Sequence, residues 1–225
     1  MKVIRYPKRE IWQEILARPA FETKSLERHV QSILNGVKRD GDAALRHFTK
    51  TLDRAEVEDF AVSESEFVEA DARISGELKD AINHAKSNIE KFHAAQREEP
   101  KVIETTPGVF CWRKSVAIER VGLYAPGGTA PLFSTVLMLG IPAQIAGCPE
   151  IILCSPPDEN GKIADVILYT AKLLGIDKVF KIGGAQAIGA MAYGTETVPN
   201  CFKIFGPGNQ FVTCLLYTSP SPRDS

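Results

Sequence analysis

Four loops rich in glycine and proline hold the residues of this sequence that are best suited to bind a ligand. They are YAPGGTAP (124–131), CSPPDENGK (154–162), GGAQ (183–186) and GPGN (206–209), and three of them carry paired or closely spaced glycines. Glycine lets backbone N–H groups approach a ligand without a Cβ in the way, and a helix that follows presents its positive end. The chemistry indicated is the binding of an anion. Tight strand-to-helix turns explain the same glycines, and the loops alone leave both interpretations open.

Several familiar site patterns are absent from the sequence. No loop matches the dinucleotide pattern G-x-G-x-x-G or the phosphate-binding pattern G-x-x-x-x-G-K-[ST]. The histidines lack the i, i+4 pairing of a helical metal site, so we expect them to be solvated or structural. We expect Cys148 and Cys154 to be core residues, since a cysteine in apolar surroundings is usually inert. The four histidines are His29, His47, His84 and His93.

The loops follow short apolar runs that recur at regular intervals from about Arg120 to Thr213. The runs are VGLY, IILC, KVFKIGG and FKIF, and a helical stretch follows each of the first three. Alternation of strand and helix predicts a parallel sheet with right-handed crossovers, and continuous apolar strands predict helices on both faces. We therefore expect a doubly wound, Rossmann-like α/β domain at 120–213. Its ligands would bind at the carboxyl ends of the strands, where the four loops lie.

The N-terminal half has the periodicity of helices. In SLERHVQSILNGVKRDG the apolar residues recur every three or four positions, at Leu26, Val30, Ile33 and Val37, and the pattern ends at a glycine. SESEFVEADARI begins like a capping box, and ELKDAINHAKSNIEKFHAAQ forms a longer amphipathic helix. Only EDFAVS predicts a strand between them, and two extended segments follow from Gly108. We infer that these helices belong to a second, incomplete α/β domain.

Composition limits the class of protein. The chain has 225 residues, 44% hydrophobic and 24% charged, with 27 basic and 28 acidic side chains. No cluster of Lys and Arg with interleaved aromatics is present, so we do not expect nucleic acid as a partner. Five dispersed cysteines favour reduced thiols in the cytoplasm over a disulfide framework. The start has no signal-peptide pattern, and no apolar stretch is long enough for a membrane span.

One long block is specific enough to indicate a family. VGLYAPGGTAPLFSTVLMLGIPAQIAGC is followed, in order, by EIILCSPP, VFKIGGAQAIGAMAYGTETVP and KIFGPGNQFVT. These four collinear motifs resemble those of histidinol dehydrogenases. The resemblance is diffuse in the N-terminal helices and close from Arg120 to about Thr213.

The resemblance implies an activity and a set of cofactor contacts. It implies oxidation of L-histidinol through histidinal to L-histidine, with two NAD+ and one zinc ion per active site, by a cytoplasmic homodimer. It assigns NAD binding to Tyr124, Gln186 and Asn209, whose amides and hydroxyl suit ribose hydroxyls and a carboxamide. Without the resemblance, Tyr124 would be a tyrosine at the edge of the core. Gln186 and Asn209 would then be residues that satisfy free N–H groups at helix starts.

The sequence departs from the family after Thr213. The final stretch, CLLYTSPSPRDS, has no counterpart in the family, and the zinc ligands, a Glu-His pair and the other catalytic residues would lie beyond it. We therefore assign no catalytic or metal residue, and we expect these 225 residues alone to be inactive. We expect a helical segment with an extended connector at 1–119, an NAD-side domain at 120–213, and a foreign or disordered tail at 214–225. A dehydrogenase of another small polar alcohol and a non-catalytic nucleotide-binding module stay as alternatives.

Overall fold

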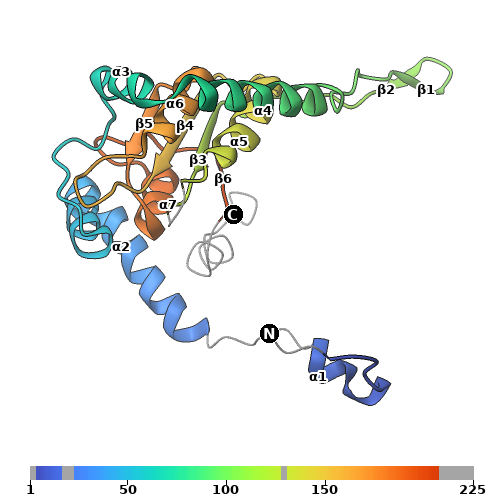
Figure 1. The fold of residues 1–225 in the computed structure, drawn as a ribbon. Coiled ribbons are helices and arrows are strands. Elements are labelled where there is room, and N and C mark those ends of the chain that lie inside the picture. Colours follow the sequence, from blue (N-terminus) through green and yellow to red (C-terminus); the bar gives the residue numbers. More distant parts are fainter. Residues whose placement is uncertain (1–3, 17–22, 128–130, 208–225) are drawn as a thin grey trace.

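A four-stranded parallel sheet forms the centre of the protein (Figure 1). The computed structural model describes residues 4–16, 23–127 and 131–207. Within them the strands lie in the order β5-β4-β3-β6, and the predicted doubly wound α/β fold is confirmed. The strands are β3 (Arg120–Tyr124), β4 (Glu150–Ser155), β5 (Lys178–Lys181) and β6 (Lys203–Phe205).

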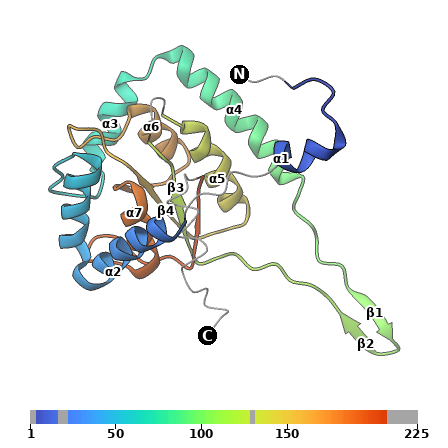
Figure 2. The ribbon, with the colours of Figure 1, turned by 90° about the horizontal axis from the view of Figure 1, so that it is seen from below.

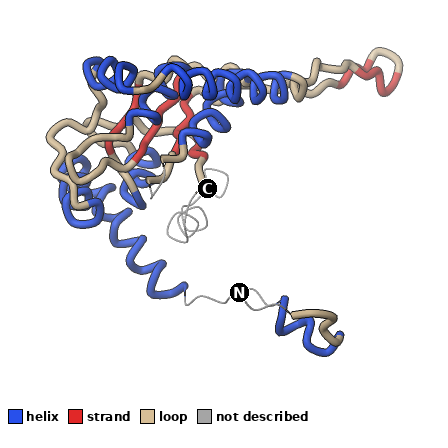
Figure 3. The backbone as a smooth tube through the Cα atoms, in the orientation of Figure 1, coloured by secondary structure: helices blue, strands red, loops and turns tan. Residues whose placement is uncertain are grey.

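Helices cover both faces of this sheet and create two apolar cores (Figure 3). On one face, α5 (Phe133–Ile145) and α6 (Asp165–Leu173) pack on side chains such as Leu123 and Leu153. On the other face, α7 (Gly184–Tyr193) packs on alternate strand residues such as Ile152 and Cys154. Because successive strand side chains point to opposite faces, one apolar run supplies both cores.

The N-terminal helices form an outer layer. They pair with the later helices in a nested order, in which the last of them packs on the first of the later helices and the first packs on the last. α4 (Gly76–Ala94) packs on α5, α3 (Glu64–Arg73) packs on α6, and α2 (Thr23–Phe48) packs on α7. We expected these helices to belong to a second, incomplete α/β domain. In the described residues they complete the two cores of the same sheet. The division of the chain at residue 119 stays a prediction.

The strand expected at EDFAVS also joins this sheet. Ala61 forms an isolated antiparallel bridge with Phe180 of β5. The N–H of Val62 donates to the carbonyl of Val179 at 2.9 Å, and that of Lys181 donates to the carbonyl of Phe60 at 2.8 Å. The segment therefore lies along the outer edge of β5.

Local sequence signals account for the helix boundaries. Val30, Ile33 and Val37 are buried on α2, as predicted, and the helix is interrupted at Gly41, whose φ is 52°. The capping box is present at α3: the Ser63 side chain accepts from the N–H of Glu66, and the Glu66 carboxylate accepts from the N–H of Ser63. Such reciprocal bonds satisfy two donors that a helix start leaves open.

The remaining elements are short. η1 (Arg9–Ile11) and α1 (Trp12–Leu16) lie near the start, and the π-helical turn η2 (Thr49–Asp53) follows α2. The antiparallel hairpin of β1 (Ile103–Thr106) and β2 (Val109–Cys111) extends away from the sheet in both ribbon views (Figures 1 and 2). None of the helices described is long and apolar enough to cross a membrane.

Candidate functional site

The order in which successive strands join the sheet reverses at β3, and this switch point marks the candidate site. The chain passes from β3 to β4 and on to β5, and then α7 carries it back so that β6 pairs with the other side of β3. In open α/β sheets, ligands bind in the crevice at the carboxyl ends of the strands, at such a switch point. Tyr124 is the last residue of β3, and Gly206 directly follows β6.

The glycines of these loops allow the loops to approach one another closely. A Cβ on Gly183 would lie 2.5 Å from the Cβ of Pro156, and one on Gly127 would lie 2.5 Å from the Cγ of the same proline. A Cβ on Gly206 would lie 2.7 Å from the carbonyl oxygen of Tyr124. Because real Cβ atoms do not approach so closely, the loops converge only with glycine at these positions. Close packing between the loops therefore explains these three glycines without a ligand.

Tyr124 lies in the core at the carboxyl end of β3. Its side chain is 5% exposed and belongs to the core between the sheet and α7. Its hydroxyl oxygen accepts a hydrogen bond from the N–H of Gly184 at 3.0 Å, at the first residue of α7. Burial raises the pKa of the Tyr124 hydroxyl above its ordinary value. The hydroxyl therefore keeps its proton near neutral pH and has an O–H to donate.

Gln186 is fully buried at the start of α7, and its amide joins α7 to the turn after α2. Its Nε2 donates to Oδ2 of Asp53 at 2.9 Å. Its Oε1 has no hydrogen-bond partner within the described structure. That oxygen lies against Gly184, where an added Cβ would be only 2.8 Å away. The amide does not cap its own helix, so the structure does not support the capping interpretation of Gln186.

Asp53 is a site residue that the sequence reasoning missed. It ends η2, and its carboxylate also accepts a hydrogen bond from the N–H of Gly183. Burial raises its pKa to about 6, although the hydrogen bonds from Gln186 and Gly183 act in the opposite direction. No sequence pattern pointed to this residue, because its partner amide is 133 positions away. A π-helical turn is itself common at functional sites.

The third predicted NAD residue, Asn209, lies outside the described residues, and so does the predicted tail at 214–225. The structure thus brings together two of the three predicted residues, Tyr124 and Gln186, through Gly184. The NAD role of all three stays a prediction.

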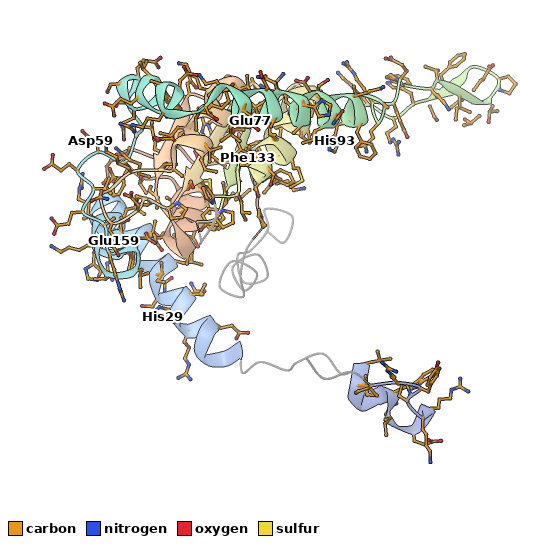
Figure 4. The ribbon with its side chains drawn as sticks, viewed as in Figure 1. His29, Asp59, Glu77, His93, Phe133 and Glu159 are labelled. Carbon is orange, nitrogen blue, oxygen red and sulfur yellow. The ribbon has the colours of Figure 1, made fainter. Side chains whose placement is uncertain are left out.

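The residues that the structure describes contain no group of three or more His, Cys, Asp and Glu side chains that could hold a metal ion. His29 and His93 lie on α2 and α4, well separated in the molecule (Figure 4). Cys154 is buried in the core, as predicted, and burial raises the pKa of its thiol. Cys148 is partly buried against the other core. These described side chains do not fit a zinc site.

Two surface hollows are present in the described structure. One, of about 760 Å³, runs along the bend of α2 and is lined by residues such as Asn35 and His47. The other, of about 700 Å³, includes Arg120, Glu150 and Lys178, which begin three of the strands. It therefore lies at the amino ends of the strands, opposite the switch point. Neither hollow includes Tyr124 or Gln186.

Comparison with known proteins gives a consistent result. The sequence model of the histidinol dehydrogenase family matches residues 16–215. A histidinol dehydrogenase of Bacteroides fragilis is 57% identical over 213 residues, which are 95% of this chain and 50% of that protein. One of Aliivibrio fischeri is 53% identical over 88% of this chain and 45% of its own length.

A solved structure agrees with the sequence matches. The crystal structure of histidinol dehydrogenase from Elizabethkingia anophelis superposes with a TM-score of 0.87 at 53% identity, covering 92% of this chain and 48% of that one. The chain thus spans about half the length of the relatives it matches. The loop motifs are collinear with those of the family, the family model matches most of the chain, and the fold is shared. This chain therefore belongs to the histidinol dehydrogenase family.

Proposed function

We propose that this chain forms the NAD-binding part of a histidinol dehydrogenase, which oxidises L-histidinol through histidinal to L-histidine. NAD+, when bound, accepts the hydride that leaves the alcohol. The whole enzyme would work as a homodimer in the cytoplasm, in histidine biosynthesis. Membership of the family supports the activity, and the switch point of the sheet supports the position of the dinucleotide.

The observation that carries the proposal is the unpaired Oε1 of Gln186. A buried acceptor without a partner is costly, and native structures leave few of them. Here the acceptor lies at the start of α7, over a glycine that leaves room for it. A hydroxyl or amide N–H of a dinucleotide would supply the missing donor.

Each proposed contact has a defined chemical role. The Tyr124 hydroxyl accepts from Gly184 and can donate its own proton to a ribose or phosphate oxygen of the dinucleotide. Gln186 accepts a hydrogen bond through Oε1. Asn209 follows β6 in the sequence, and its amide can both donate and accept. We assign no catalytic step to zinc, because the described residues do not form a site for it.

The test measures cofactor binding directly, in the protein produced from the complete gene. NADH fluorescence titrations would compare the parent with Gln186→Ala and Tyr124→Phe. Each change removes about one proposed hydrogen bond to the cofactor, so we expect the Kd for NADH to rise roughly two- to tenfold. Gln96→Ala is the matched control, since Gln96 is exposed at the end of α4.

Two results would contradict the proposal. If both variants fold and bind NADH as tightly as the parent, the crevice is not the cofactor site. If the parent forms no NADH from NAD+ and L-histidinol, the proposed reaction is wrong even if NADH binds.

A further inference from the structure

The carboxylate of Asp53 holds two groups at the start of α7. Its Oδ2 accepts from Nε2 of Gln186 at 2.9 Å, and the same carboxylate accepts from the N–H of Gly183. A Cβ on Gly183 would come within 3.0 Å of Oδ1, so a side chain at Gly183 would crowd that oxygen. Asp53 thereby contacts both Gln186 and Gly183. It joins the turn after α2 to the helix that carries Gln186.

This arrangement determines which way the Gln186 amide faces. An ionised carboxylate can only accept hydrogen bonds, so the amide must turn its NH₂ group toward Asp53. The carbonyl oxygen of the amide then faces the other way. That oxygen is the buried acceptor without a partner. A neutral side chain in place of Asp53 would not impose this orientation.

We propose that Asp53 is a positioning residue for the dinucleotide: it orients the Gln186 amide so that Oε1 accepts a hydrogen bond from a hydroxyl or amide N–H of NAD. The inference rests on the proposed function, because it requires that Gln186 contacts the cofactor. It adds to that function a residue that never touches the ligand and acts through another side chain.

The decisive change is Asp53→Asn. The new amide can still accept from the N–H of Gly183 through its oxygen, and it then points its NH₂ group at Gln186. Gln186 must turn its own oxygen toward this donor and present NH₂ to the cofactor, donor against donor. We expect the Kd for NADH at pH 8 to rise roughly three- to tenfold, about the loss of one hydrogen bond. Asp59→Asn is the control, because Asp59 is exposed (Figure 4).

A reciprocal exchange tests the orientation itself. In Asp53→Asn/Gln186→Glu, the amide at position 53 donates to one carboxylate oxygen at position 186, and the other oxygen faces the cofactor as an acceptor. The pair keeps its charge and its hydrogen bond, so we expect NADH affinity to return to within roughly threefold of the parent. A purely structural role would instead require that Asp53→Asn weakens NADH binding by destabilising the fold, so the unfolding temperature of Asp53→Asn should not fall below that of the parent.

The outcomes separate this inference from the proposed function. If Gln186→Ala weakens NADH binding but Asp53→Asn does not, or if the exchange binds no better than Asp53→Asn, the positioning role is wrong and the cofactor site stands. If Gln186→Ala also leaves NADH binding unchanged, both are wrong. Thermal unfolding of each variant confirms that it is folded. If neither Asp53→Asn nor the exchange folds, the pair is not interchangeable and the inference is overturned.

Discussion

Replacement of Asp53 by Asn should stabilise the protein near neutral pH, although it removes a carboxylate that accepts two hydrogen bonds. The reason is the cost of holding that carboxylate ionised in the folded state. Burial raises its pKa from 3.8 to about 6, despite the bonds from Gln186 and Gly183. Asn keeps the size of the side chain and can keep both contacts, but it carries no charge. The variant therefore removes the cost of burying the charge.

The magnitude follows from the pKa difference. A shift of about two units corresponds to roughly 3 kcal/mol, at about 1.4 kcal/mol per unit. Asp53 is only partly buried, so solvent screening reduces this to about 1–2 kcal/mol. Because the folded pKa lies above the unfolded one, the folded state holds the proton more tightly. The stability from protonated Asp53 is fully present below about pH 4, and it is lost as the pH rises to about 6.

Urea unfolding of the parent and Asp53→Asn at pH 7.5 and pH 4.5 would test this. We expect Asp53→Asn to be more stable by about 1–2 kcal/mol at pH 7.5, and the difference should shrink strongly at pH 4.5. Other carboxylates titrate equally in both proteins and cancel in the comparison. The exposed control, Asp59→Asn, should show no pH-dependent difference.

Two results would refute this reasoning. If Asp53→Asn is less stable at pH 7.5, the hydrogen bonds of the carboxylate outweigh its burial. If the difference does not change with pH, the effect does not arise from the charge. In the expected outcome, Asp53 is retained at a cost in stability, as functional residues often are.

Three further substitutions test the packing of the outer helices α2 and α3 by thermal unfolding. Gly41→Ala should lower the free energy of unfolding by about 1–2 kcal/mol, because its φ is 52° and a Cβ would lie 2.4 Å from the Glu196 carboxylate. Its control, Gly76→Ala, should have little effect, because the space around Gly76 is open. Leu45→Ala should cost about 2–5 kcal/mol, since Leu45 is fully buried, and a comparable loss for the exposed control Leu52→Ala would contradict the assigned core. Glu66→Ala should lower the free energy of unfolding by about 1–3 kcal/mol, because it breaks the capping box and leaves the buried Lys181 without its carboxylate partner. Its control, Glu64→Ala, removes only an exposed ion pair and should cost less than about 1 kcal/mol.

Features that depend on neighbouring residues could be predicted from the sequence. The strands β3 to β5 follow from short apolar runs, because a strand buried on both faces needs apolar side chains at nearly every position. The start of α3 follows from Ser63 and Glu66, which are three positions apart and bond to each other. The burial of Val30, Ile33 and Val37 follows from helical spacing.

Features that depend on distant partners could not be predicted in the same way. The bond between Asp53 and Gln186 joins residues 133 positions apart, and neither lies in a pattern that indicates the other. The segment around Ala61 is too short to show which strand it would join, and its pairing with Phe180 is visible only in the structure. The motif predicts Tyr124 at the end of a strand, but its bond to Gly184 depends on how α7 returns across the sheet.

The nested order of the outer helices also has a consequence for folding. The paired helices are separated by about 40, 90 and 140 residues for α4–α5, α3–α6 and α2–α7, so the innermost pair closes the smallest loop. Once that pair has formed, it shortens the effective loop of the next pair and lowers its closure cost by about 1 kcal/mol. Assembly should therefore proceed outward, with α2 last. During synthesis at about 5–20 residues per second, α7 emerges roughly 10–30 s after α2. The apolar face of α2 is exposed during this interval and can then bind chaperones or aggregate.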